Sequence, residues 1–341
     1  MSFLNFFRRW QKSPQITIPN TLQNAFFDFY NHKLPATDNA NPHPFETEYA
    51  KNFFQSHLHE NPTSANQQFS KKIKNFFDSE ETFTTISGID HGKTRNLSED
   101  DKIHHATLLT STILSQSTQR IRGPNGFYLA FSSNPKVAID YHIDIINPYK
   151  IPKYMALIAL DVDSSCPTNL IDNDFVVEEL KKHNPKIFEI LSTVDFRLKN
   201  KSYQERQPID NIFSIISKPE NGKYFICIPD DENRFYLDES RLEKYSKDEV
   251  IESLNQFREI LKKLPNQQIS LSTKDETMPQ ILIFKNQRLL HARLNKVADE
   301  EKRNLVYLPL NPNSGKPSEK PTSSPKISSF LQILTPFQLN K

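Results

Sequence analysis

The chain has 341 residues, and its 43 Lys and Arg nearly balance its 41 Asp and Glu, leaving a formal net charge of +2. The basic residues are dispersed along the sequence, which argues against a nucleic-acid partner. Its two cysteines, Cys166 and Cys227, form no zinc-binding spacing, so any bound metal has to use histidine and carboxylate ligands. So few cysteines also predict a reducing, cytoplasmic location without disulfides.

The termini and the glycine content exclude further classes. No window approaches about 18 consecutive apolar residues, so no transmembrane helix is predicted. In the segment 1–12 the Arg pair follows the apolar run, the reverse of the order in a signal peptide, so we expect it to be amphipathic and uncleaved. The chain has six glycines and no GxGxxG or GxxxxGK motif, which disfavours a phosphate-binding loop.

Helical patterns flank and interrupt the chain. Residues 21–31 and 50–57 carry such patterns, so we expect residues 1–76 to form a helical extension that packs on the core. Further helices are predicted over 98–115, over 174–191 with a break at Pro185, and over 247–264. The last of these is the clearest, because Ser246 and Glu249 match a capping box before an apolar stripe.

Short apolar runs bounded by turn residues predict many strands. These runs occupy residues 81–89, 127–132, 138–145, 154–163, 211–217, 224–228, 234–238, 268–272, 280–285, 288–294 and 304–310. Short strands with one long helical insertion indicate a barrel or sandwich of strands decorated by helices.

The region after the last strand differs in composition. Residues 311–326 contain four prolines with Ser, Lys and Asn, and we expect them to form a flexible linker. Residues 327–341 are apolar again and are expected to dock on the main domain or on a protein partner.

A histidine and a carboxylate occur two residues apart in one predicted strand. His142 and Asp144 would leave the same face of that strand, which is how a strand offers two ligands to one metal. A second histidine completes the two-His, one-carboxylate triad of non-haem Fe(II) oxygenases. His291, in the strand at 288–294, is the candidate because a turn joins that strand to the preceding one and the intervening chain is long.

The HxD pattern alone is weak evidence, because such spacings arise by chance. The other eight histidines lie in polar or helical contexts, and we interpret them as structural or exposed. The pair His104 and His105 is the one competing cluster, and adjacent residues on a helix do not face the same point.

Two stretches resemble the clavaminate synthase-like branch of the Fe(II)/2-oxoglutarate-dependent oxygenases, related to taurine dioxygenase. The first is His142-Ile-Asp144 followed by Asn147-Pro-Tyr-Lys150 and a buried strand, and the second is Asn286-Gln-Arg-Leu-Leu-His291-Ala-Arg293. The resemblance covers roughly residues 77–310 and implies a mainly β double-stranded β-helix (jelly roll) in that range.

The same resemblance implies roles for other residues. Arg303 corresponds to the arginine that pairs with the far carboxylate of 2-oxoglutarate, a task that suits its rigid fork of donors. Thr168 resembles a threonine that touches 2-oxoglutarate, and Asp238 ends a strand at a substrate-facing position. The metal ligands are then His142, Asp144 and His291, with Fe(II) as cofactor and 2-oxoglutarate as cosubstrate.

Departures from the family pattern bear on the substrate. Ala292 replaces the usual glycine of the distal motif, and Pro279-Gln280 replaces a Gly-Asp pair. Tyr307 stands where the amino-acid hydroxylases of this branch have a second arginine that holds the substrate carboxylate. A free α-amino acid, a modified amino acid, a peptide-linked residue and another small molecule all remain open.

Two hypotheses follow. The first is a dioxygenase that uses O2 to hydroxylate a C–H bond of a small molecule, an amino acid or a derivative of one, and releases succinate and CO2. Because Asp144 is present, hydroxylation or desaturation is favoured over halogenation. The second is a family member that has lost productive catalysis and acts as a binding or interaction protein through its two unusual termini.

Overall fold

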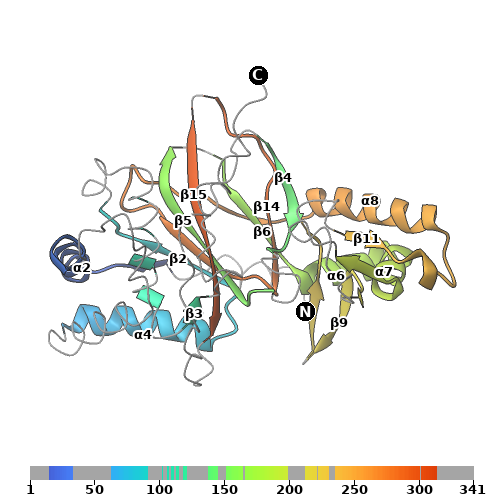
Figure 1. The fold of residues 1–341 in the computed structure, drawn as a ribbon, viewed down its shortest axis with the longest axis horizontal. Helices are drawn as coiled ribbons and strands as arrows, with labels where there is room; N and C mark the ends of the chain where they lie inside the picture. Colours follow the sequence, from blue (N-terminus) through green and yellow to red (C-terminus); the bar gives the residue numbers. More distant parts are fainter. Residues whose placement is uncertain are drawn as a thin grey trace, which may run out of the picture.

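The computed structural model describes most of the region between residues 63 and 312, together with a short N-terminal part (Figure 1). The described ranges are 15–33, 63–90, 118–120, 137–144, 151–163, 166–198, 212–220, 222–229, 235–299 and 301–312, with isolated helical positions between 102 and 114.

Two β-sheets form the centre of the molecule (Figure 1). The larger has the order β1-β2-β13-β5-β15-β3, formed by Gln15–Thr17, Phe83–Ser87, Ile281–Lys285, Tyr154–Asp163, Lys302–Pro312 and Thr118–Arg120. The smaller has the order β12-β6-β14-β4, formed by Gln267–Ile269, Thr168–Asp172, Leu289–Arg293 and Ile139–His142. Within these sheets only the β1–β2 pair is parallel. Most neighbours are far apart in the sequence, so the sheets hold the whole described chain together.

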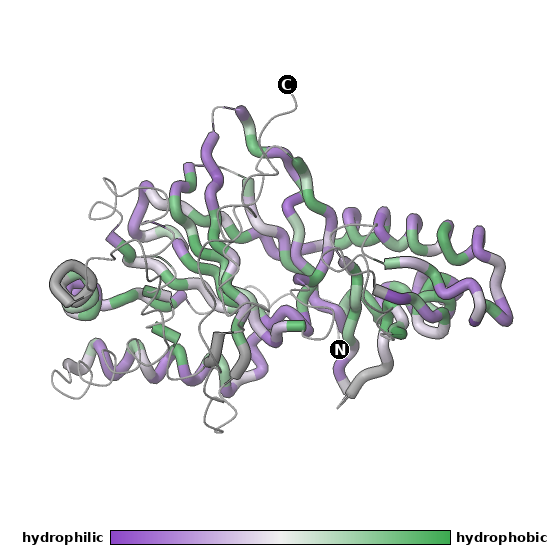
Figure 2. Tube along the Cα trace, in the orientation of Figure 1, coloured by the Kyte–Doolittle hydropathy of each residue, from purple (hydrophilic) through white to green (hydrophobic). Residues whose placement is uncertain are grey.

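Strand β5 is buried on both faces, which explains its continuous apolar run. Met155 and Leu157 belong to a core that includes residues of the smaller sheet and of three helices, whereas Ala156 and Ile158 belong to a second core on the opposite face of the larger sheet. This alternation follows the two-residue period of a strand. Figure 2 shows the apolar residues concentrated in these central strands.

Helices cover the two ends of the molecule (Figure 1). On one flank lie α2 (Asn20–Lys33) and α4 (Ser64–Asp78), whose buried residues join the second core. On the other lie α6 (Asn173–His183), α7 (Pro185–Thr193) and α8 (Lys247–Lys263). A short 3-10 helix, Glu239–Arg241, and two small sheets accompany them. One small sheet pairs β9 (Ile216–Glu220) with β10 (Lys223–Ile226), and the other has the order β11-β7-β8, formed by Phe235–Leu237, Phe196–Leu198 and Ile212–Phe213.

Most predicted elements are present with small shifts at their ends. The helix expected from Lys247 has the predicted capping box of Ser246 and Glu249, and the predicted break at Pro185 separates α6 from α7. The prediction of one strand over 211–217 was wrong. This segment divides into β8 and β9 because the two halves pair with different partners, β7 and β10.

Helix α4 and strands β1, β3, β6 and β7 were not predicted. The apolar residues Phe69, Ile73 and Phe76 of α4 are buried at helical spacing after the N-cap Thr63, so a helical signal is present in the sequence. Because β1 pairs with β2, residues before 77 contribute a strand to the larger sheet as well as helices. Strand β15 extends to Pro312, two residues into the expected linker. The division into extension, core domain, linker and tail stays a prediction.

Several predictions lie outside the described residues. These are the N-terminal segment 1–12, the helix at 50–57, most of the helix at 98–115, the strand at 127–132, residues 313–326 of the linker, and the apolar tail 327–341. Within the part of the chain that the structure describes, no helix is long and apolar enough to cross a membrane.

Candidate metal centre

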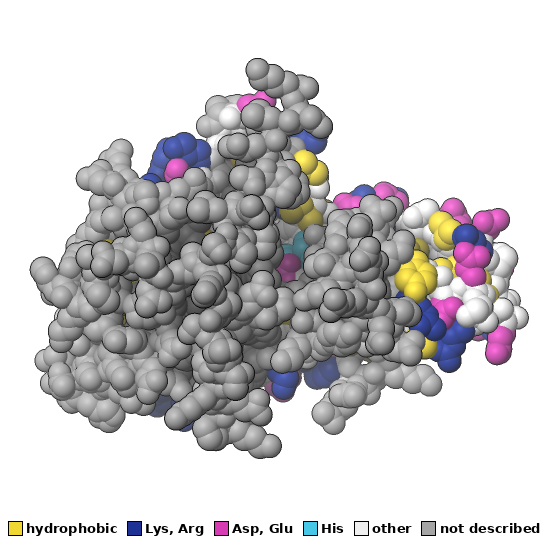
Figure 3. Space-filling view, in the orientation of Figure 1, with side chains coloured by type: hydrophobic (Ala, Val, Ile, Leu, Met, Phe, Trp, Pro, Cys, Tyr) yellow, Lys and Arg dark blue, Asp and Glu magenta, His cyan; other side chains and the backbone are white. Residues whose placement is uncertain are grey.

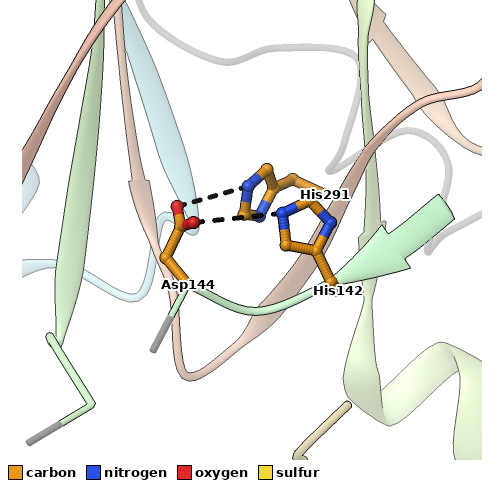
Figure 4. Close-up of side chains that lie close together, drawn as sticks. All are labelled: His142, Asp144 and His291. Carbon is orange, nitrogen blue, oxygen red and sulfur yellow. Dashed lines mark ion pairs between the residues drawn. The ribbon is translucent and has the colours of Figure 1, made fainter. Parts of the chain in front are cut away.

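The three predicted metal ligands meet at the junction of β4 and β14 (Figure 4). His142 and His291 lie directly opposite each other in the antiparallel pairing of these strands, with ring centroids 4.1 Å apart. Their potential ligand atoms and those of Asp144 all lie within 4.8 Å of one another. Strands separated by more than a hundred residues therefore bring the two sequence motifs to one point.

The donor atoms are spaced as metal ligands require. Asp144 Oδ1 lies 3.9 Å from His142 Nε2, and Asp144 Oδ2 lies 3.3 Å from His291 Nε2 (Figure 4). Ligands about 2.1 Å from a metal and at right angles to each other are roughly 3 Å apart. An ion of this size fits between the three groups with small side-chain adjustments.

The two histidines differ in the hydrogen bonds that their ring nitrogens make. His142 Nδ1 lies 2.8 Å from the carbonyl oxygen of Asp140. Because a carbonyl only accepts hydrogen bonds, Nδ1 carries the proton and Nε2 presents its lone pair toward Asp144. Both ring nitrogens of His291 are buried and have no hydrogen-bond partner within the described residues. A buried polar atom without a partner is costly, and a metal ion at Nε2 removes that cost.

A β-bulge in β4 changes the direction of the His142 side chain. Arg293 pairs with Ile139 while His291 pairs with His142, so Asp140 and Tyr141 together face the single residue between His291 and Arg293. Bulges of this kind bend a strand and redirect its side chains, and they are common beside active sites. The extra residue also brings the Asp140 carbonyl to His142 Nδ1.

Asp144 is not in the strand that was predicted to contain it. Strand β4 ends at His142, so the period of a strand does not by itself place the carboxylate. The buried amide of Asn286 holds the backbone instead, because its Oδ1 accepts from the Asp144 N–H at 3.1 Å and its Nδ2 donates to the Asp144 carbonyl at 3.0 Å. Nδ2 also lies 3.2 Å from the Pro152 carbonyl. The sequence marked Asn286 only as part of the distal motif and its turn.

The cluster lies at the interior surface of the larger sheet but remains partly accessible. The ring of Phe284 on β13 is 4.9 Å from that of His291. The side chain of Asp144 is 22% exposed, compared with 8% for His142 and 4% for His291. Histidine and acidic side-chain atoms are visible near the centre of the face shown in Figure 3. Asp144 is thus the most accessible of the three side chains.

Arg303 and Thr168, which the resemblance assigned to 2-oxoglutarate, contact each other. Arg303 is 4% exposed, and its Nη2 donates to Thr168 Oγ1 at 2.8 Å while its Nε donates to the Cys166 carbonyl at 3.3 Å. No carboxylate of the described chain pairs with Arg303, and its Nη1 has no acceptor there. A buried cation without a counter-ion is costly, so the guanidinium is well suited to bind an anionic ligand.

A second buried arginine lies near the first. Arg293 is 2% exposed, and its Nη2 donates to the Val137 carbonyl at 2.5 Å. Burial and then the positive charge of Arg303 lower the pKa of the Arg293 guanidinium below its ordinary value. This residue appeared in the sequence only as the end of the distal motif.

Asp238 is already paired within the chain. It follows β11, where its carboxylate accepts hydrogen bonds from Ser240 Oγ at 2.6 Å and from Arg197 Nε at 2.7 Å. These two donors, Ser240 first, hold the pKa of the Asp238 carboxyl below its usual value. The structure therefore gives Asp238 a local ion pair, and its assignment to a substrate stays a prediction.

The structure describes only some of the histidines outside the cluster. His183 lies on α6 as an exposed side chain, with Nε2 3.7 Å from the half-buried Glu179 of the same helix. His104 and His105 lie outside the described residues.

Comparison with known proteins finds solved structures that have a similar fold. No protein-family model matches the chain, and no curated protein matches it in sequence. Among solved structures, the non-heme iron oxygenase OrfP in complex with Fe aligns with a TM-score of 0.58 at 13% identity, over 88% of this chain and 94% of that one. The two proteins share a fold.

Two further structures of OrfP align equally well. OrfP in complex with Fe and alpha-ketoglutaric acid gives a TM-score of 0.57 at 11% identity, and OrfP with Fe, succinate and (3R,4R)-dihydroxy-L-Arg gives 0.56 at 12%. Both alignments cover 88% of this chain and 94% of OrfP. At such identities the likeness to OrfP is one of fold, so the chemistry has to be argued from the site.

Proposed function

We propose that the chain is an Fe(II)/2-oxoglutarate-dependent dioxygenase that hydroxylates a C–H bond of a small molecule. The observation that carries the proposal is the meeting of His142, Asp144 and His291 with their donor atoms within 4.8 Å of one another. Two imidazoles and one carboxylate on one face of an Fe(II) ion leave its remaining positions open for ligands. OrfP, which shares the fold, was crystallised with Fe and alpha-ketoglutaric acid.

The roles of the chain's own residues follow from their contacts. The triad would hold the ion, with the Asp140 carbonyl fixing the proton on His142 and Asn286 fixing the backbone of Asp144. The bound ion supplies the redox chemistry by which O2 and 2-oxoglutarate convert a C–H bond to an alcohol, with succinate and CO2 as coproducts. Because all three ligands are present and come together, a family member without catalysis is the less favoured alternative.

The cosubstrate is assigned to Arg303 and the residues that contact it. The free Nη1 and the Nη2 of Arg303 would bind the far carboxylate of 2-oxoglutarate, and Thr168 would hold the guanidinium in place. A guanidinium that keeps two donors toward one carboxylate gives geometric specificity as well as charge. Arg303 and Thr168 are therefore the proposed cosubstrate residues.

The substrate is proposed to be an amino acid or a derivative of one. OrfP has been crystallised with L-Arg and with L-canavanine, which makes this class the first to test. If Asp238 contacts the substrate, a cationic group has to share its carboxylate with Arg197 or displace it. A succinate-release screen over free amino acids, dipeptides and modified amino acids would identify the class.

The finer features of the architecture belong to the same proposal. We propose that the two central sheets form a double-stranded β-helix, with residues 77–310 as the oxygenase domain and 1–76 as an extension. The sheets face each other across a shared core, which supports this assignment. Cys166 and Cys227 are both buried thiols outside any disulfide, which supports a reducing compartment such as the cytoplasm. The tail 327–341 remains a candidate contact for a protein partner.

Metal content tests the proposal. The full-length chain, loaded with Fe(II) without oxygen and then dialysed, should retain one equivalent of iron, and His291→Ala should retain far less. A matched control is His183→Ala, which removes an exposed imidazole outside the cluster. Wild-type protein that retains no more iron than His291→Ala would refute the assignment of the metal site.

A further inference from the structure

The turn that joins β13 to β14 carries the amide that holds the candidate metal carboxylate. Residues 285–288 span this turn, which the Arg288 N–H closes by donating to the Lys285 carbonyl at 2.9 Å. Within it, Asn286 bonds to both backbone groups of Asp144. The position of Asp144 therefore depends on what holds the turn from its other side.

The connection from α4 to β2 lies against that other side of the turn. Strands β2 and β13 are antiparallel neighbours in which Phe284 pairs with Phe83, so the residue after Phe284 lies beside the residue before Phe83. The backbone N–H of Lys285 accordingly donates to the Thr82 carbonyl at 2.8 Å. The ammonium of Lys285 donates to the Ser79 carbonyl at 2.5 Å. One lysine thus joins the turn to this connection at two points.

The ammonium of Lys285 completes the C-terminal end of α4. Ser79 is the C-cap of this helix, so its carbonyl has no partner within the helix. Helix α4 has no basic residue in its own last turn, and a cation near the C-terminus stabilises a helix. Lys285 supplies both the donor and the positive charge from a strand that is distant in the sequence.

Lys285 is held more firmly than a surface lysine. Its side chain is half-buried, and the loss of hydration lowers the pKa of its ammonium, although the nearby Glu80 carboxylate opposes this change. An ammonium with reduced hydration depends on its protein acceptor, so breaking its bond to the Ser79 carbonyl is costly. The other contact of the turn with this connection, Arg288 to Glu80 at 3.7 Å, involves a carboxylate that is 86% exposed and contributes little.

We infer that Lys285 is a positioning residue for the metal site, which it connects to the end of α4 through the turn and Asn286. This inference rests on the proposed function and extends it, because it makes α4 and its connection to β2 part of the iron site. Coupling of this kind is reciprocal, so an ion bound at Asp144 should also strengthen the contact between the turn and the α4 connection.

A purely structural role for Lys285 predicts a different outcome. If its bonds only fasten α4 to the larger sheet, loss of the ammonium would lower the free energy of unfolding and leave the iron affinity of the folded protein unchanged. If Lys285 acts through Asn286, the iron affinity falls as well. That fall should then disappear once the Asn286 amide has been removed, because the effects of residues in one chain of contacts are not additive.

Anaerobic calorimetric titration of the full-length protein with Fe(II) separates the two roles. The variants are Lys285→Met, which keeps the length of the side chain without its donor, and Lys285→Arg, which keeps the donor and the charge. Lys285→Gln takes the place of Lys285→Met if that protein does not fold. Lys285→Met is also combined with Asn286→Ala. Lys181→Met is the matched control, since it removes a paired lysine of α6 whose ammonium donates to Tyr224 Oη at 2.6 Å, outside the turn.

The expected result is a loss of iron affinity that depends on Asn286. Wild type and Lys181→Met should bind Fe(II) equally well, Lys285→Met should bind it about threefold or more weakly, and Lys285→Arg should lose less. In the Asn286→Ala background, Lys285→Met should cause little further loss. Unchanged affinity in Lys285→Met, or an equal loss in both backgrounds, would overturn the inference while leaving the proposed function intact. If wild-type protein binds no Fe(II), the proposed function itself fails.

Discussion

At the scale of single residues, the site depends on an amide that bonds only to backbone atoms. Asn286 is fully buried and joins the Asp144 N–H, the Asp144 carbonyl and the Pro152 carbonyl. A side chain that satisfies three backbone groups on a connection between strands fixes the position of the metal carboxylate. In the proposed metal site, Asn286 would therefore act on the ion through Asp144.

Asn286→Ala should weaken Fe(II) binding as well as stability. Each buried backbone group left without a partner costs about 1–3 kcal/mol, and the Asp144 carboxylate loses its fixed position. Anaerobic Fe(II) titration and chemical unfolding would measure the two effects. The control is Gln287→Ala, whose side chain donates to the Ile151 carbonyl at 3.4 Å and does not touch Asp144. Unchanged iron affinity in Asn286→Ala would exclude a positioning role.

The sequence pointed to the candidate ligands but not to the residues that orient them. His142, Asp144 and His291 were predicted from their residue types and order, and Arg303 and Thr168 from the family resemblance; the structure brings the first three together and places Arg303 in contact with Thr168. Roles that depend on bonds to backbone atoms, such as that of Asn286, are invisible without the pairing of strands. For the same reason, the ion pair of Asp238 with Arg197 was not foreseen.

At the scale of elements, Asp172 links the smaller sheet to α6. Its buried carboxylate accepts from the N–H groups of Asp174 and Phe175 as the helix N-cap, and it lies 3.7 Å from Arg288 Nη2. Burial, the largest effect, raises the pKa of Asp172 to about 6, although Arg288 and the N–H groups oppose the change. The folded chain therefore holds a proton that the unfolded chain releases near pH 4.

This pKa gives a pH dependence with a defined sign. Because the folded pKa is the higher one, the contribution of Asp172 to stability is greatest below about pH 4 and declines as the pH rises to about 6, by about 3 kcal/mol. Asn is an equally good N-cap, so Asp172→Asn should remove this decline and not lower stability near neutral pH. Urea unfolding of both proteins across that pH range would test the prediction. Identical pH profiles would contradict it.

Elements were predictable where the pattern is local. The capping box of α8 and the apolar run of β5 are examples, and both lie close to their predicted bounds. The bulge in β4 and the division of 211–217 into two strands were not predictable, because each depends on which strand lies alongside. The position of Asp144 beyond β4 is a consequence of the same limit.

At the scale of the whole molecule, the site joins both sheets. Metal ligands come from the smaller sheet and the connection after it, whereas Arg303 comes from the larger one. The order of strands in the sheets could not be predicted from the sequence, because β5 pairs with strands more than a hundred residues further along the chain. Ligands that bridge the two sheets should therefore stabilise the entire fold.

Ligand binding should raise the melting temperature in two steps. A ligand that binds only the folded state at about a hundred times its Kd adds about 2.7 kcal/mol of stability. Mn(II) should raise the Tm of the full-length protein, and 2-oxoglutarate should raise it further with the metal present. Asp144→Ala should show neither increase in full. A wild-type Tm that is insensitive to both ligands would contradict a combined metal and cosubstrate site that joins the two sheets.

The central claim is that His142, Asp144 and His291 hold an Fe(II) ion that consumes 2-oxoglutarate. The most direct measurement is succinate formed from 2-oxoglutarate by the Fe(II)-loaded protein in the presence of O2, compared between wild type and Asp144→Ala. Wild type should produce succinate, at a higher rate with a substrate from the amino-acid screen, and Asp144→Ala should fall to the level of a protein-free control. Equal succinate from both proteins would contradict the claim.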